Sequence, residues 1–208
     1  MKKFVSLMLA LVLSLALAVP CFAVQVDADE NIQDSYNAYL TVADEVSKEY
    51  DLKIQVVPIE EFDFATELSI EDYEALLTSL GRLHKKQDVN EYITMSVSRA
   101  SGRTVSKTVE YESVGAHTTD VTITGTFTTT YNATHDSQVF ASATFSDPTF
   151  SNWRLKWDGT PVIDHSYLDA RRTCYVYVQG DVLINQNTSI ENFDVSCYFY
   201  CTNTGKIY

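Results

Sequence analysis

The spacing of apolar residues changes once along this 208-residue chain, and that change constrains the fold more than any other feature. Up to about residue 90 the apolar side chains recur every three or four positions, as on one face of a helix. Beyond about residue 104 they alternate with polar residues, as in half-buried strands. We therefore expect an α+β protein, with a helical N-terminal region over residues 24–90 and a β-rich domain over residues 104–208.

The N-terminal region is predicted to fold as helix, strand, helix. The first helix covers residues 32–50, and its apolar stripe comprises Ile32, Tyr36, Tyr39, Leu40, Ala43, Val46 and Tyr50. Apolar residues alternate over residues 52–56, and Pro58 ends that segment. The second helix follows Ser69, a favourable N-cap residue, with Asp72 placed as in a capping box and Leu68 able to staple onto Tyr73. Its buried stripe is predicted to comprise Tyr73, Leu76, Leu77, Leu80 and Leu83.

The C-terminal region is predicted to form an antiparallel β-sandwich of six or seven strands. Alternation marks strands over residues 105–112, 121–131, 139–145, 153–157, 174–184 and 193–201. Asp158 and Gly159 form a dipeptide typical of a tight hairpin, so the strand that contains Trp153 and Trp157 is expected to turn back there. Residues 91–103 are expected to be either a linker or an edge strand.

Residues 1–23 have the three parts of a secretory signal peptide. Lys2 and Lys3 form a basic head, an apolar run covers residues 4–19, and Pro20 precedes a small-residue exit that ends at Ala23. We expect cleavage after Ala23 and export of the protein. No later apolar segment is long enough to cross a bilayer, so no membrane anchor is expected in the mature chain. The short signal with its paired lysines indicates a bacterial protein.

The charge of the chain argues against nucleic acid as a partner. Removing residues 1–23 takes away two lysines, which changes the formal charge from −13 to −15 and leaves 185 residues. Most of the excess acid lies in residues 24–90, where it fits a solvated helical face. Binding to nucleic acid requires clustered Lys and Arg, which the chain lacks.

Three cysteines remain after cleavage, namely Cys174, Cys197 and Cys201. Cys197 and Cys201 are four residues apart on one strand face, roughly 13 Å in a straight strand, which is too far for a bridge between them. Cys174 lies on the preceding strand and faces the same side. In an exported protein we expect Cys174 to pair with one of the other two, and the alternative is three buried thiols.

The sequence predicts no catalytic, metal or cofactor site. The four histidines, His84, His117, His135 and His165, have none of the usual zinc spacings. The chain also lacks a nucleophile-elbow motif and a phosphate-binding glycine loop. If the protein were a small hydrolase, we would expect its cleft near Asp136 and His165.

Aromatic residues provide the clearest candidate for a binding surface. Tyr175 and Tyr177 on one strand, and Tyr198 and Tyr200 on the next, are predicted to share the sheet face that points away from the core. They would form a platform for a glycan ring or a protein partner. The structural alternatives, which we favour, are that the helices pack across this face or that the tyrosines pair across the strands. Trp153 and Trp157 are predicted to lie in the core.

From the sequence we expect a secreted, non-catalytic binding or interaction protein whose partner is a protein or a glycan. Two other functions stay open: a carbohydrate-binding module that uses the four tyrosines, and a small secreted hydrolase. Nothing in the sequence indicates the oligomeric state.

Overall fold

The structure, a computed structural model, describes residues 20–85, 92–94, 103–109 and 119–208. Side chains are described within these ranges from residue 31 onward, except those of residues 92–94. Residues 1–19 of the predicted signal, His117 and the last three residues of the predicted 105–112 strand lie outside the described residues. Contacts divide the chain into two units, Met1–Leu40 and Thr41–Tyr208. Within the described residues, no helix is both long and apolar enough to cross a membrane.

Two α-helices and nine strands are described. In chain order they are α2 (Pro20–Tyr50), β1 (Lys53–Val56), α3 (Ile70–Lys85), β2 (Tyr92–Thr94), β3 (Arg103–Val109), β4 (Val121–Asn132), β5 (Ser137–Phe145), β6 (Thr149–Phe150), β7 (Leu155–Leu168), β8 (Thr173–Ile184) and β9 (Thr188–Tyr200). The predicted order of helix, strand and helix followed by strands is confirmed. α2 begins at Pro20, a residue suited to the first helical position, and runs through the predicted cleavage position.

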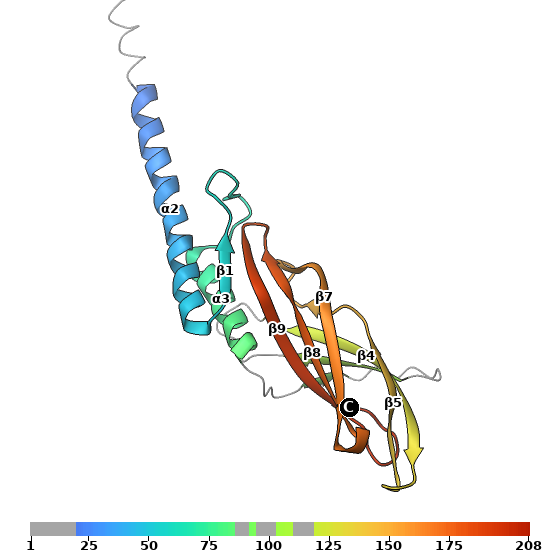
Figure 1. The fold of residues 1–208 in the computed structure, drawn as a ribbon. Coiled ribbons are helices and arrows are strands. Elements are labelled where there is room, and N and C mark those ends of the chain that lie inside the picture. The colour runs from blue at the N-terminus through green and yellow to red at the C-terminus, as the bar shows by residue number, and fades with distance from the viewer. Residues whose placement is uncertain (1–19, 86–91, 95–102, 110–118) are drawn as a thin grey trace, which may run out of the picture. The chain divides into compact units, whose positions relative to one another are not determined.

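The strands form two antiparallel sheets, called here sheet A and sheet B. Sheet A has the order β1-β9-β8-β7, and sheet B has the order β2-β3-β4-β5, with the short β6 paired to β4. Figure 1 shows β9, β8 and β7 side by side, with β4 behind them. Strand β1 is therefore an edge strand of sheet A, and β2, within residues 91–103, is an edge strand of sheet B.

Aromatic side chains join the two sheets face to face. Phe127 of β4 lies 4.8 Å from Phe199 of β9 between ring centroids, and Phe150 of β6 lies 4.9 Å from Trp157 of β7. Further along β7, His165 lies 5.3 Å from Phe145 of β5. Offset and tilted ring pairs at these separations stabilise a core beyond the area they bury. The predicted α+β fold with an antiparallel β-sandwich is confirmed.

Helix α3 forms as its sequence predicts and packs on the core side of sheet A. The Ser69 hydroxyl accepts a hydrogen bond from the backbone N–H of Asp72 at 3.2 Å, which satisfies one of the free donors at the helix start. The Tyr73 hydroxyl lies 2.9 Å from the hydroxyl of Thr188, a buried residue opposite Ile184. All five residues of the predicted stripe, Tyr73, Leu76, Leu77, Leu80 and Leu83, are buried.

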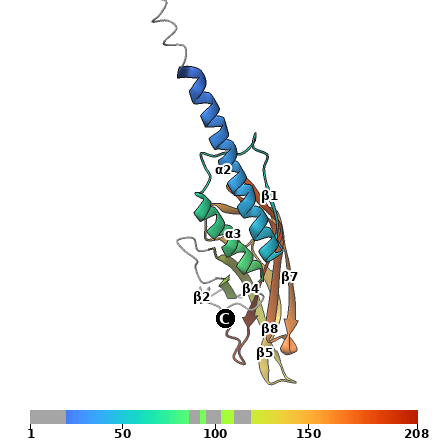
Figure 2. The same ribbon diagram turned by 90° about the vertical axis from the view of Figure 1, so that its left-hand side faces the viewer.

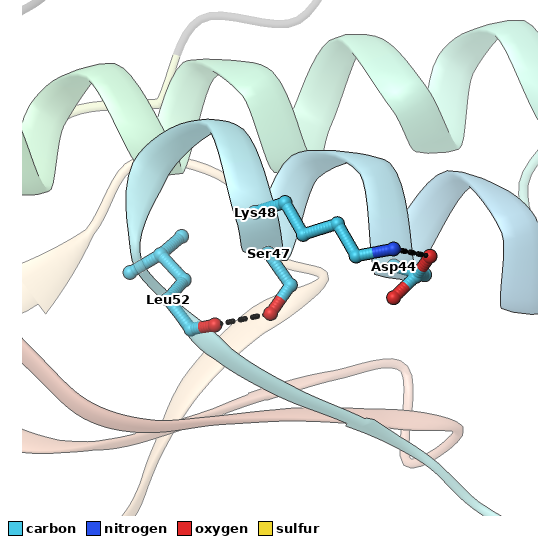
Figure 3. Close-up of polar contacts among 4 residues, drawn as sticks. All are labelled: Asp44, Ser47, Lys48 and Leu52. Atoms are coloured by element: carbon cyan, nitrogen blue, oxygen red, sulfur yellow. Dashed lines mark hydrogen bonds and ion pairs between the residues drawn. The ribbon is translucent and has the colours of Figure 1, made fainter.

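The end of α2 packs against α3, as Figure 2 shows. Tyr50 lies against Gly81, where an added Cβ would meet the Tyr50 ring, and its hydroxyl accepts a hydrogen bond from Arg82 at 3.3 Å. Asp51 then adopts a left-handed conformation with φ of 56°, a usual way to leave a helix. In Figure 3 the Ser47 hydroxyl donates to the Leu52 carbonyl, and Lys48 pairs with Asp44 at 2.5 Å. Of the predicted α2 stripe, Ile32 and Leu40 are exposed and the other five residues are buried.

The predicted hairpin at Asp158 and Gly159 is wrong. Strand β7 continues through both residues to Leu168, and the pairing with β8 jumps from Asp158–Asp181 to Val162–Gln179. Three residues of β7 therefore bulge opposite one residue of β8, and Gly159 takes the positive φ of 88° that this bulge requires. The chain instead reverses after Leu168, where residues 169–171 all have positive φ.

A second irregularity changes which side chains β4 and β5 bury. The pairing of these strands shifts between Thr128 and Thr129, so the regular alternation of buried residues in β4 ends at Phe127. Beyond the shift Tyr131 is exposed. On β5 Ala141 is exposed, and its neighbour Phe140 is fully buried. The alternation was correct, but one bulge reversed its direction.

Candidate functional site

The four predicted tyrosines alternate with the buried residues of β8 and β9 and so share one face of sheet A, although the Tyr200 ring also meets Lys107 of sheet B. Tyr175 pairs directly with Tyr198 across β8 and β9, with ring centroids 5.1 Å apart. Tyr198 and Tyr200 are 6.3 Å apart, and Tyr200 is 5.6 Å from Tyr208 near the C-terminus. All four predicted tyrosines are partly exposed. We call this surface, made of Tyr175, Tyr177, Tyr198 and Tyr200, the tyrosine face.

Tyr177 joins the tyrosine face to the helical side of the protein. Its hydroxyl hydrogen-bonds to Asp194, and Asp194 also lies 2.5 Å from Nδ1 of His84 at the end of α3. Burial raises the pKa of Tyr177, and the charge and hydrogen bond of Asp194 raise it further, with a smaller contribution from Tyr175. Tyr177 is therefore a neutral donor that positions Asp194, rather than a residue with an accessible phenolate.

Helix α3 leaves most of the tyrosine face uncovered. Two contacts of α3 lie on the core side of β9: the Tyr73 hydroxyl meets Thr188, and the His84 ring meets Phe193. Among the described contacts of α3, that of His84 with Asp194 reaches the tyrosine side. Tyr175 and Tyr198 do pair across the two strands, and whether this face also binds a ligand stays a prediction.

The three described cysteines are buried free thiols, so the expected bridge is absent from the structure. Cys174 pairs with Phe199, which makes Cys197 and Cys201 its diagonal neighbours, two residues away in either direction. Diagonal Cα atoms are about 7–8 Å apart in a sheet, at or beyond the limit for a disulfide. Burial raises the pKa of Cys174 to about 11, which keeps it protonated and unreactive.

The residues named for a hydrolase cleft do not form one. Asp136, in the exposed β4–β5 turn, accepts a hydrogen bond from the Tyr131 hydroxyl. His165 lies on β7, where its described ring contacts are Phe145 and Tyr167. Among the described residues, no three His, Cys, Asp or Glu side chains gather where they could hold a metal ion.

A groove that the sequence did not reveal lies beside Trp153. The prediction that Trp153 belongs to the core is wrong, because its side chain is 81% exposed. Trp157 is partly buried, lies against Phe150 and donates its indole N–H to the Pro148 carbonyl at 2.9 Å. The groove has a volume of about 490 Å³, within the range of small-molecule sites, and it is open to solvent.

A tight turn before β7 holds Trp153 outward. The backbone N–H of Leu155 donates to the Asn152 carbonyl at 3.0 Å, so Trp153 and Arg154 occupy the two central positions of the turn. The Asn152 side-chain oxygen accepts the N–H of Arg154 at 3.1 Å, which fixes the turn from within. The Arg154 guanidinium lies 4.6 Å from the centroid of the Trp153 ring. The indole is therefore positioned by its neighbours even though solvent surrounds most of it.

Two segments far away in sequence complete the groove. Residues 65–67 come from the loop before α3, and Asn185 and Gln186 form the β8–β9 turn, where both residues have positive φ. Arg154 and Asn185 each donate a side-chain hydrogen bond to the Thr66 carbonyl, at 3.1 and 2.9 Å. Those two bonds hold the walls of the groove together.

Asn187 anchors the loop that supplies one wall. Its side-chain oxygen accepts the N–H of Asp63 at 2.9 Å, and its side-chain N–H₂ donates to the Asp63 carbonyl at 3.0 Å and to Glu67 at 2.6 Å. Asn187 is only 1% exposed, so this exchange is protected from water. The groove is thus built on hydrogen-bonded turns rather than on a loose loop.

No protein-family model matches the sequence, and comparisons with curated proteins and with solved structures found no significant similarity. The class of the protein is therefore defined by its own fold and candidate site. The protein is an α+β protein with a two-sheet β domain, an open polar groove beside an exposed tryptophan, and a row of tyrosines on a sheet face.

Proposed function

We propose that this protein is an exported, non-catalytic binding protein of bacterial origin, and that the groove beside Trp153 is its ligand site. The observation that carries the proposal is the exposure of Trp153 at the edge of the groove. Tryptophan is costly to leave in water, and its indole is well suited to stack on a ligand. Carbohydrate is the ligand class that best fits an exposed, flat ring surrounded by hydrogen-bonding side chains.

The surroundings of Trp153 support binding rather than turnover. Asn185, Gln186 and Lys156 offer hydrogen-bond donors and acceptors beside the ring, as in sites where a few polar groups orient a ligand. Glu67 is the one carboxylate that lines this groove, and both of its oxygens accept hydrogen bonds from the protein, from Leu68 N–H and from Asn187. General acid–base hydrolysis of a glycan normally uses two carboxylates.

The test is binding of the mature protein, residues 24–208, to an array of immobilised glycans. We expect Trp153→Ala to lower binding by about 5- to 150-fold, if a sugar ring stacked on the indole contributes about as much as a stacked base, on the order of 1–3 kcal/mol. Trp157→Phe is the matched control and should keep binding. Equal binding by wild type and Trp153→Ala would contradict the proposal.

The tyrosine face is a second candidate for glycan binding, favoured by the continuous contacts from Tyr175 through Tyr198 and Tyr200. In that case Tyr177→Ala with Tyr198→Ala would abolish binding on the same array, while Trp153→Ala would bind normally. Unfolding curves of every variant are needed alongside, because Tyr177 also bonds to Asp194. The two variants thus assign binding to one surface or the other.

A further inference from the structure

We infer that the groove beside Trp153 takes an acidic oligosaccharide, in which a hexuronic acid ring stacks on the indole and its carboxylate is bound by Lys156, with the charge of Arg154 nearby. The inference rests on the proposed function and specifies its ligand. It follows from the charge of the groove compared with the charge of the rest of the chain.

The groove is cationic on a strongly acidic protein. The mature chain carries −15, yet two cations, Arg154 and Lys156, line this groove together with a single carboxylate. That carboxylate, Glu67, accepts hydrogen bonds from the N–H of Leu68 at 3.0 Å and from Asn187 at 2.6 Å, so much of its charge is already compensated inside the protein. An anionic ligand would be attracted to this place and repelled by most of the remaining surface.

The two cations have different roles. Arg154 is tied into the fold because it donates to the Thr66 carbonyl and lies over the Trp153 ring, so its charge is held close to the indole. Lys156 follows two residues later on β7, where its side chain is exposed to solvent. Because Arg154 lies over one face of the indole, a sugar ring would stack on the other face, where its carboxylate can turn towards Lys156 while Arg154 adds positive charge nearby.

The remaining lining suits a sugar better than a peptide. The apolar lining consists of Trp153 and the small Ala65, so the groove lacks a pocket that would hold an apolar peptide side chain. The Thr66 carbonyl already accepts two hydrogen bonds and offers little to a peptide backbone. The side-chain amides of Asn185 and Gln186 can exchange hydrogen bonds with ring hydroxyls.

The experiment is a titration of the mature protein, with binding measured as quenching of the fluorescence of the exposed Trp153. The three probes are a hexuronic acid trisaccharide, a neutral hexose trisaccharide of the same linkage, and tetra-aspartate. We expect the uronate to bind about tenfold more tightly than the neutral sugar in low salt, and to weaken as salt screens the charges. Lys156→Gln should weaken uronate binding about fivefold and neutral-sugar binding clearly less, so that the preference for the uronate falls. Lys206→Gln, an exposed lysine outside the groove, removes the same charge and should change neither.

Each other result has a distinct meaning. If both sugars bind equally and Lys156→Gln has no effect, the acidic ligand is refuted while glycan binding at Trp153 stands. Tighter binding of tetra-aspartate than of uronate would overturn the sugar in favour of an acidic peptide. If no sugar binds at Trp153 here or on the array, the proposed function fails as well.

Discussion

Replacing Gly81 with alanine tests whether α3 and the end of α2 pack as closely as the structure shows. A Cβ at Gly81 would lie 2.6 Å from Cδ2 and 2.8 Å from Cβ of Tyr50. Carbon atoms in favourable contact are about 3.5–4.0 Å apart, so the helices would have to move. Overpacking of this kind costs about 1–3 kcal/mol, and this overlap belongs at the upper end. Against this cost, alanine has a higher helix propensity than glycine and stabilises α3 by about 1 kcal/mol.

We therefore expect Gly81→Ala to lower the free energy of unfolding by about 2 kcal/mol. For a domain of this size that loss corresponds to a fall in Tm of about 4–8 °C. The measurement is urea unfolding of the mature protein, followed by circular dichroism, with the slope checked for a constant m value.

A double-mutant cycle with Tyr50→Ala separates overlap from other effects. Tyr50→Ala alone should cost about 3–5 kcal/mol, because it removes a buried aromatic ring. It also removes the ring atoms that meet the new Cβ but keeps the Cβ of residue 50, so Gly81→Ala should cost clearly less in that background than in the wild type. The expected coupling is about 1 kcal/mol in favour of the double variant. An equal cost of Gly81→Ala in both backgrounds, or a gain in the wild type, would refute the close approach of Tyr50.

Three further predictions follow from buried or exposed single residues. Tyr73→Phe should cost about 1–2 kcal/mol in urea unfolding, because it leaves the buried Thr188 hydroxyl without its partner at 2.9 Å, and an unchanged stability would contradict that hydrogen bond. Trp153→Phe should remove most of the acrylamide-quenchable fluorescence, whereas Trp157→Phe should leave it, and the reverse pattern would contradict the exposed turn. Because the pKa of Cys174 rises from 9.0 to about 11 on folding, its contribution to stability should be fully present below pH 9 and be lost as pH rises towards 11. Cys174→Ala should remove that part of the decline, which a series of unfolding curves across this pH range measures.

Local signals predicted α3 almost completely. Ser69 and Asp72 define its start, and the repeat of leucines every three or four residues defines its buried face. Both signals act within a few residues, so no knowledge of the rest of the fold was needed. The tyrosine face was also predictable, because alternation along β8 and β9 places its members on one side of adjacent strands.

The hairpin prediction failed where long-range packing outweighed a local preference. The Asp158–Gly159 dipeptide favours a hairpin, yet β7 continues past it because a bulge absorbs the extra residues. Gly180 on the opposite strand permits this, since a side chain there would come within 3.0–3.3 Å of Trp157 and Pro161. The partner strand therefore decides between a turn and a bulge, and a single strand's sequence cannot show it.

Lys107 shows the same limit in a different form. Alternation along β3 places it on the buried side with Val105 and Val109, and it is only 1% exposed. Its ammonium lies 5.1 Å from the ring centroid of Tyr200 and 5.5 Å from that of Phe199, so two aromatic faces receive the charge. The period of the strand indicates the side, but it does not reveal the aromatic rings of β9 that help to make a lysine tolerable there.

The groove was beyond sequence reasoning because none of its walls is informative alone. Trp153 stands in a turn whose Asn152 cap directs it outward, whereas an apolar residue near a strand is normally expected inside. Its partners, Thr66 and Asn185, are separated from it by 87 and 32 positions and meet through side-chain bonds to one carbonyl. An Asx turn that carries a tryptophan is the one local signal that could have marked the site. Such a turn holds the tryptophan in a fixed position at the surface. A fixed side chain loses less conformational entropy when a ligand binds, so this arrangement favours ligand binding, whereas it adds nothing to the packing of the core.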